Sequence, residues 1–137
     1  LPPGTSSPIV FLAGGIGITP FRSMVEFATY EKLPQKIYLF YSNKTVESIA
    51  FLGDFEKWKL ENPNFEFSPT ITESEHSDWK YETGRVGKEM LSRCIPNLAE
   101  PVYYIAGPDS FVVGMYEVLV GAGVSQERIK TEEFTGY

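Results

Sequence analysis

The stretch Ile9-Val10-Phe11-Leu12-Ala13-Gly14-Gly15-Ile16-Gly17-Ile18-Thr19-Pro20 decides how this chain is expected to fold. Its first five residues form a continuous apolar run, which is typical of a central parallel strand buried on both faces. Glycines then permit a tight turn, and Pro20 suits the first turn of a helix, where a missing N–H leaves no bond unmade. The stretch therefore predicts a buried strand, a glycine loop and a helix in direct succession.

The rest of the chain repeats this alternation of short apolar runs with longer amphipathic segments. Strands are expected over 36–41, 65–72, 101–106 and 128–134, and helices over 48–60, 87–95 and 110–120. Such alternation indicates an α/β fold, a Rossmann-like three-layer sandwich in which an open parallel sheet carries helices on both faces. We expect about five strands in the order 3-2-1-4-5. Phe51, Leu52, Phe55 and Trp58 are predicted to share the apolar face of the second helix.

Composition restricts the classes of function. The chain has 137 residues, 42% of them hydrophobic, which fits one ordered domain, and its formal charge of −6 argues against nucleic acid as a partner. The single cysteine and single histidine leave no internal disulfide, four-cysteine cluster or multi-histidine metal site, so no metal is expected. No apolar run reaches the ~20 residues of a membrane span, and we expect a cytoplasmic protein.

The beginning of the chain predicts a domain boundary. Residues 1–8 are rich in Pro, Gly and Ser and do not start with Met, so they are interpreted as the remnant of an interdomain linker. Residues 9–137 are then the nucleotide-binding domain proper. The sequence is accordingly expected to be a fragment of a longer protein.

The glycine loop is the strongest candidate site. Gly14, Gly15 and Gly17 allow the backbone to approach a pyrophosphate, the following helix directs its free N–H groups there, and Thr19 adds a hydroxyl donor. A valine at position 17 is expected to block binding without disturbing the fold. Glycine spacing alone leaves open a turn that binds nothing, and the loop departs from the Rossmann fingerprint, with Pro20 in place of its third glycine and no acid after the second strand.

Two further segments are expected beside the same crevice. Gly107-Pro108-Asp109 follows the fourth strand, which is expected to lie next to the first strand at the point where the strand order reverses. The same three residues are also explained as the start of a helix with an Asp that stabilises the helix dipole. Glu132, Glu133 and Phe134 end the last strand. A carboxylate there can relay a proton and an aromatic ring can cover a flat cofactor, but terminal charges are also commonly just solvated.

Together these motifs resemble the C-terminal pyridine-nucleotide domain of the ferredoxin–NADP reductase superfamily. The four matching segments are residues 14–21 (GGIGITPF), 41–45 (YSNKT), 104–109 (YIAGPD) and 131–134 (TEEF). The resemblance covers nearly the whole chain, and it explains the proline, because the family's loop normally ends in Thr-Pro or Ala-Pro. In this family a flavin, FAD or FMN, sits in a separate N-terminal β-barrel, and hydride passes between nicotinamide and flavin where the two domains meet.

The resemblance also implies roles for individual residues. The loop Gly14, Gly15, Gly17, Ile18, Thr19 and Pro20 would lie under the pyrophosphate and nicotinamide ribose. Asn43 and the residues around Thr72 and Glu73 would hold the adenosine ribose, with Ser42 beside them, and Gly107, Pro108 and Asp109 would form the nicotinamide side. Thr19 would be nearest the nicotinamide, Phe134 would cover the flavin, and Glu132 would be the carboxylate linked to proton transfer. These last three are the candidate catalytic residues.

Two departures from the family pattern limit what can be carried over. Ala106 stands where many members have a cysteine, so no thiol acts at that position. NADP-specific relatives tend to carry an arginine after the third strand, whereas here Glu73 follows Thr72. The Glu73 carboxylate favours NADH over NADPH, although the positive charge of Lys44 favours NADPH. The flavin signature Arg-x-Tyr-Ser is missing from the chain.

The expected function is therefore the nucleotide module of a flavoprotein oxidoreductase. Its partners would be a flavin-binding domain in cis or in trans and an electron acceptor such as ferredoxin, haem or another carrier. Two alternatives remain open at this point: a stand-alone, non-catalytic nucleotide-binding module, and the cytosolic tail of a membrane ferric or haem reductase.

Overall fold

A computed structural model describes residues 7–73 and 79–133. Its sheet has six strands in the order β4-β3-β2-β1-β5-β6, and every neighbouring pair is parallel. The strands are β1 (Ile9–Gly14), β2 (Ile37–Asn43), β3 (Phe65–Ile71), β4 (Glu82–Thr83), β5 (Val102–Gly107) and β6 (Ile129–Glu133). The predicted α/β class and the order of the five predicted strands are confirmed. The sequence did not indicate β4, because a two-residue edge strand has no periodicity to detect.

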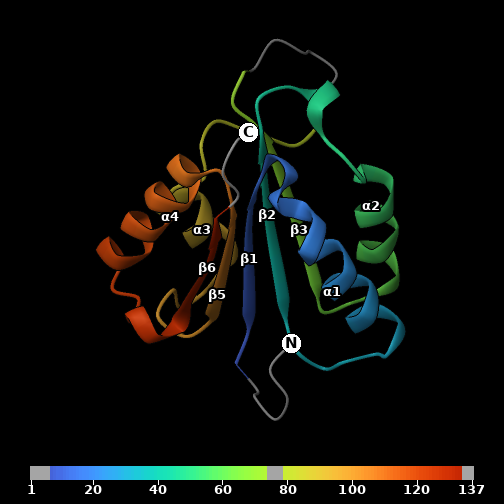
Figure 1. Cartoon of the computed structure of the whole chain (residues 1–137). Helices are drawn as coiled ribbons and strands as arrows, with labels where there is room; N and C mark the ends of the chain where they lie inside the picture. The colour runs from blue at the N-terminus through green and yellow to red at the C-terminus, as the bar shows by residue number, and fades with distance from the viewer. Residues whose placement is uncertain (1–6, 74–78, 134–137) are drawn as a thin grey trace.

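Helices cover both faces of the sheet (Figure 1). On one face lie α1 (Ile18–Tyr30) and α2 (Leu52–Glu61), and on the other α3 (Lys88–Cys94) and α4 (Asp109–Gly121). Short 3-10 turns occupy η1 (Gly15–Gly17), η2 (Val46–Ser48) and η3 (Gln126–Arg128). Pro20 lies in the first turn of α1, as predicted. Among the described residues, no helix has both the length and the apolarity needed to cross a bilayer.

The core is divided by the sheet into two apolar clusters. In β1, Ile9, Phe11 and Ala13 point to the α1–α2 cluster, whereas Val10 and Leu12 point to the α3–α4 cluster. All five side chains have 0% exposure, so β1 is buried on both faces as its apolar run predicted. Each cluster is closed by helices of this chain. We therefore expect the 137 residues to fold without a partner.

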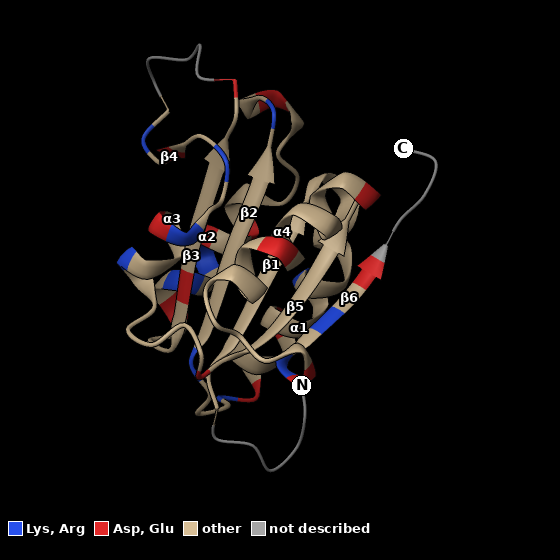
Figure 2. Cartoon of the chain, turned by 90° about the vertical axis from the view of Figure 1, so that its left-hand side faces the viewer, with Lys and Arg blue, Asp and Glu red and all other residues tan. Residues whose placement is uncertain are grey.

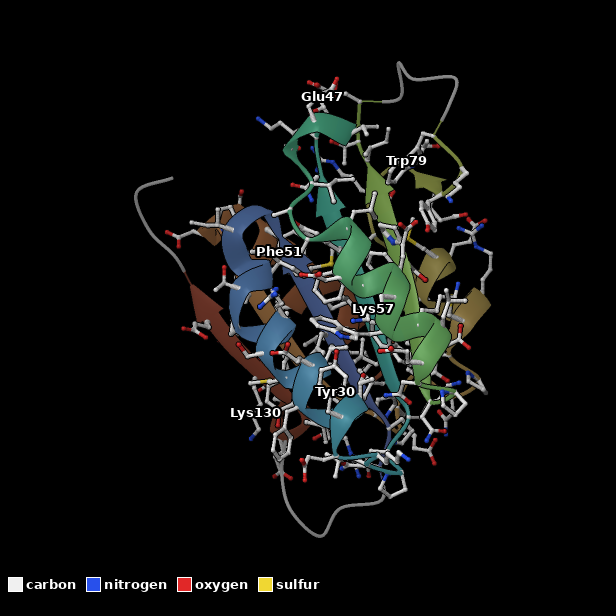
Figure 3. All side chains as sticks on the ribbon, turned by 90° about the vertical axis from the view of Figure 1, so that its right-hand side faces the viewer. Tyr30, Glu47, Phe51, Lys57, Trp79 and Lys130 are labelled. Carbon is white, nitrogen blue, oxygen red and sulfur yellow. The ribbon has the colours of Figure 1, made fainter. Side chains whose placement is uncertain are left out.

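One predicted core position is wrong. Phe51 does not share the buried face of α2, because the helix begins one residue later and Phe51 has a left-handed backbone with φ 64°. The residue is 42% exposed, and its ring lies 4.8 Å below the Arg22 guanidinium, which also donates to the Asp54 carboxylate at 3.0 Å. Figure 3 shows Phe51 at the start of α2, on the side of α1. Helical periodicity misplaced it because the left-handed residue rotates the chain out of the helical repeat.

Candidate functional site

A cleft of about 910 Å³ opens at the carboxyl ends of the strands. Its walls come from residues at or just after the ends of β1, β2, β3, β4 and β5 and from one side of α4. The central strand β1 lies between β2 and β5. From β1 the chain first builds the sheet outward through β2 and β3 on one side, and it later adds β5 and β6 on the other side. Open α/β sheets bind ligands at this kind of switch point, and the cleft is where the predicted crevice was expected.

Seven of the predicted binding residues line this cleft. They are Gly14, Gly15, Ser42, Asn43, Thr72, Glu73 and Pro108. The cleft also has lining residues that were not among the predicted binding residues: Lys44, Thr45, Ser48, Arg85, Val86, Ser110, Phe111, Gly114, Met115 and Val118. The lining residues of α4 recur at helical spacing. This spacing could have indicated from the sequence that one face of the helix is turned toward the crevice.

The other predicted residues lie outside the cleft wall. Ile18 is buried in the α1–α2 cluster, and the exposed Thr19 hydroxyl donates to the Ile16 carbonyl at 3.2 Å. Gly107 ends β5, and Asp109 begins α4 in its first turn. Glu132 is an exposed residue of β6 paired with Ala106, whereas Phe134 lies outside the described residues. The roles assigned to these residues stay predictions.

Gly17 holds the loop against the sheet. A Cβ atom at this position would lie 2.2 Å from the Ala106 carbonyl oxygen and 2.7 Å from the Gly107 backbone nitrogen. Backbone atoms of a central strand cannot move aside as a flexible side chain does. The expectation that Gly17→Val leaves the fold intact is therefore wrong, because the glycine is required for packing of the loop on β5.

A side chain at Gly14 or at Gly107 would clash with the same aromatic ring. A Cβ at Gly14 would lie 2.7 Å from the Phe111 ring, and one at Gly107 would lie 2.9 Å from the same ring. Phe111 comes from α4 and lines the cleft. Its ring thus packs over the ends of β1 and β5, and the two glycine turns share one aromatic cover.

Asn43, a residue that lines the cleft, has an unsatisfied buried donor. The residue is only 7% exposed, and its side-chain Nδ2 is buried without a hydrogen-bond partner among the described residues. Its backbone takes part in strand pairing, since its carbonyl accepts from the Thr72 N–H at 2.9 Å. A buried polar group without a partner costs about 1–3 kcal/mol, so such groups commonly mark a bound molecule or water.

The segment that carries Arg85 into the cleft is anchored at the edge of the sheet. The Tyr81 hydroxyl donates to the Glu56 carboxylate of α2, and the Trp79 indole donates to the Glu82 carbonyl at 2.6 Å. The Tyr81 ring also packs edge-on against Phe67 of β3. These contacts give Trp79 and Tyr81 a structural role.

Burial and the Glu56 carboxylate raise the pKa of Tyr81 to about 12. Because this pKa is above the ordinary value of 10.0, the stabilisation by Tyr81 is complete below pH 10 and is lost as the pH rises toward 12. We expect the difference in unfolding free energy between wild type and Tyr81→Phe to shrink over that interval. Denaturant titrations at about pH 8, 10 and 11.5 measure it, and a constant difference would contradict the assignment.

The chain matches known proteins in sequence. The family model of the oxidoreductase NAD-binding domain matches residues 11–116. The chain is 26% identical to one subunit of the Na(+)-translocating NADH-quinone reductase of Methylococcus capsulatus and 28% identical to its counterpart from Actinobacillus succinogenes, in each case over 96% of this chain. It covers 34% of each of these relatives, so it spans about a third of their length.

Solved structures have the same fold. A flavohemoglobin from Malassezia yamatoensis with bound FAD and heme aligns with TM-score 0.83 and 25% identity, over 98% of this chain and 33% of that one. A cytochrome P450 reductase from Amycolatopsis aligns with TM-score 0.85 and 23% identity, over 99% of this chain and 41% of that one.

Proposed function

Because this chain belongs to the oxidoreductase NAD-binding domain family, within the ferredoxin–NADP reductase superfamily, we propose that it is the pyridine-nucleotide module of a flavin-dependent reductase. The proposal assigns residues 9–137 to the nucleotide domain and residues 1–8 to a linker. The flavin would be held by a domain outside this sequence, in cis or in trans.

The unsatisfied buried donor of Asn43, a residue that lines the cleft, is the observation that carries this proposal. A dinucleotide offers phosphate and ribose oxygens that accept such a bond, and the neighbouring Gly15 presents backbone without a side chain. Gly15 has φ 56°, a conformation that glycine adopts without strain. The buried Asn43 donor and the Gly15 backbone therefore fit a ligand rich in oxygen acceptors.

Within this module the loop from Gly14 to Pro20 and the start of α1 would hold the pyrophosphate. Asn43, Thr72 and Glu73, with Ser42, would bind the adenosine half, and Gly107, Pro108 and Asp109 would form the nicotinamide side. Thr19 would approach the nicotinamide, while Glu132 and Phe134 would meet the flavin domain. A bound nicotinamide supplies a hydride to a flavin, which then releases single electrons to a carrier.

The flavin part of the proposal is supported by the relatives. They include a flavohemoglobin with bound FAD, and each matched relative continues well beyond the matched part. NADH is the favoured donor, since Glu73 can accept from an unmodified ribose hydroxyl and the first matched relatives are NADH-quinone reductases. Ferredoxin, haem or a similar carrier would receive the electrons, and a cytoplasmic location stays a prediction.

Calorimetric titration of the 137-residue chain with NADH and NADPH tests the nucleotide part. We expect weak binding with NADH the tighter ligand, and no reductase turnover by the isolated chain. Absence of binding by both nucleotides would overturn the proposed module, and a clear NADPH preference would overturn the choice of NADH. A reading frame upstream that encodes a flavin barrel, followed by stopped-flow reduction of that longer protein, separates the enzyme from a stand-alone binding module.

A further inference from the structure

The ring of Phe111 lies between the two glycine turns and the cleft. Phe111 is the third residue of α4, and Figure 2, which looks onto the α3–α4 side of the sheet, shows this helix in front of the strands. The three atoms nearest to a Cβ at Gly14 all belong to this ring, at 2.7 to 2.9 Å, and the atom nearest to a Cβ at Gly107 is the ring's Cδ2, at 2.9 Å. Both glycines are buried, whereas the ring is half-buried and lines the cleft.

This packing changes what the glycines offer to a ligand. A glycine in a phosphate-binding turn is commonly explained by close approach of the ligand to its backbone. Here the Phe111 ring takes the space through which a ligand could reach the Cα atoms of Gly14 and Gly107 from the α4 side. Gly15 also lines the cleft, with φ 56°, and its backbone is the part of the loop that stays accessible for a phosphate.

The order of the strands brings a dinucleotide past this ring. The proposed adenosine contacts lie at the ends of β2 and β3, and the proposed nicotinamide contacts lie at the end of β5. Because β1 lies between β2 and β5, a ligand that reaches both sides must cross the end of β1. The Phe111 ring covers that end, so the middle of the ligand has to pass over it.

We propose that Phe111 sets the position of the dinucleotide: its ring keeps the ligand off the ends of β1 and β5, packs against the ribose of the nicotinamide half, and leaves the pyrophosphate to the backbone of Gly15. The inference rests on the proposed function, because it concerns how the same ligand lies in the same cleft.

The physical basis is the different fit of two neighbouring ligand groups to an aromatic face. Such a face carries partial negative charge, so it cannot replace the water around a phosphate, whereas the C–H groups of a ribose pack against it. The side of α4 that lines the cleft adds no charged side chain, since its lining residues are Ser110, Phe111, Gly114, Met115 and Val118. The ring therefore favours the ribose over the pyrophosphate as its contact.

Three ligands of increasing length separate these contacts in calorimetric titrations of the 137-residue chain. ADP contains the adenosine and the pyrophosphate, ADP-ribose adds the second ribose, and NADH also adds the nicotinamide. Phe111→Ala is expected to raise the Kd for ADP-ribose and for NADH about fivefold and to change the Kd for ADP less than about twofold, because the second ribose loses the apolar surface that it covers. Phe111→Leu, which restores most of the apolar volume, should recover most of the lost affinity.

Val113→Ala is the matched control for the binding measurements. Val113 lies on the same helix with 52% exposure, but it is outside the cleft wall. This variant should leave all three Kd values unchanged.

The packing of the ring on Gly14 is tested without any ligand. Gly14→Ala should lower the unfolding free energy of the wild-type chain, because the added methyl group would lie 2.7 Å from the ring. In the Phe111→Ala background the same change should cost less than about half as much, since the ring is gone. Equal losses in the two backgrounds would overturn the contact on which the inference rests.

The ligand series also distinguishes this inference from the proposed function. An equal loss of affinity for ADP and for ADP-ribose in Phe111→Ala would place the ring against the pyrophosphate. Tighter binding of ADP-ribose by that variant would mean that the ring obstructs the ligand, and unchanged affinity for all three ligands would mean that it makes no contact. Each of these results would overturn the inference and leave the proposed function standing, whereas failure of the unmodified chain to bind any of the three ligands would overturn both.

Discussion

Replacing Gly17 with alanine is expected to abolish stable folding of the chain or to lower its unfolding free energy by about 3 kcal/mol or more. The added Cβ would lie 2.2 Å from the Ala106 carbonyl oxygen, where the nearest atoms all belong to the backbone of β5. Relief would require the loop between β1 and α1 to lift from the sheet. Chemical denaturation followed by circular dichroism measures the loss.

Gly53→Ala is the matched control for this experiment. Gly53 lies in α2, and a Cβ there would meet nothing within 4 Å. Alanine in an exposed helical position stabilises by about 0.5–1 kcal/mol relative to glycine, so this variant should be slightly more stable than wild type. If Gly17→Ala were also as stable as wild type, the packing role assigned to Gly17 would be wrong.

Asn43→Leu is expected to weaken NADH binding about tenfold while leaving the chain at least as stable as wild type. The Asn43 Nδ2 has no partner among the described residues, so removal of the amide breaks no hydrogen bond of the free chain at that atom. Elimination of an unsatisfied buried donor can even raise the unfolding free energy by about 1 kcal/mol. Calorimetry with NADH and a denaturant titration measure the two quantities on the same samples.

A second buried asparagine provides the control for Asn43. Asn62 is 6% exposed, but its amide donates to the Thr29 hydroxyl at 3.3 Å and its side-chain oxygen accepts from the Asn64 N–H at 2.9 Å. Asn62→Leu should therefore destabilise the chain, through loss of both bonds, without changing nucleotide affinity. Unchanged NADH affinity in Asn43→Leu would remove Asn43 from the proposed site.

Much of the candidate site was predictable because it depends on the end of each strand. The residues at the end of a buried parallel strand must lie at the carboxyl edge of the sheet, which agrees with the cleft position of Ser42, Asn43, Thr72 and Glu73, the residues that the family resemblance implied. The α4 wall was missed although its lining residues recur on one side of that helix. Arg85 had no signal of its own, because its position depends on a two-residue strand and on hydrogen bonds from distant residues.

The sequence by itself determined the layered α/β architecture and the position of the glycine loop. These follow from local periodicity and from turn residues, which act over a few neighbouring positions. Only the tertiary structure decided what the glycines do: Gly17 makes room for the β5 backbone, whereas Gly14 makes room for Phe111. It likewise decided that Asn43 has an unused donor and that Arg85 reaches the cleft. Contacts of this kind join residues far apart in the chain, and local pattern carries no information about such distances.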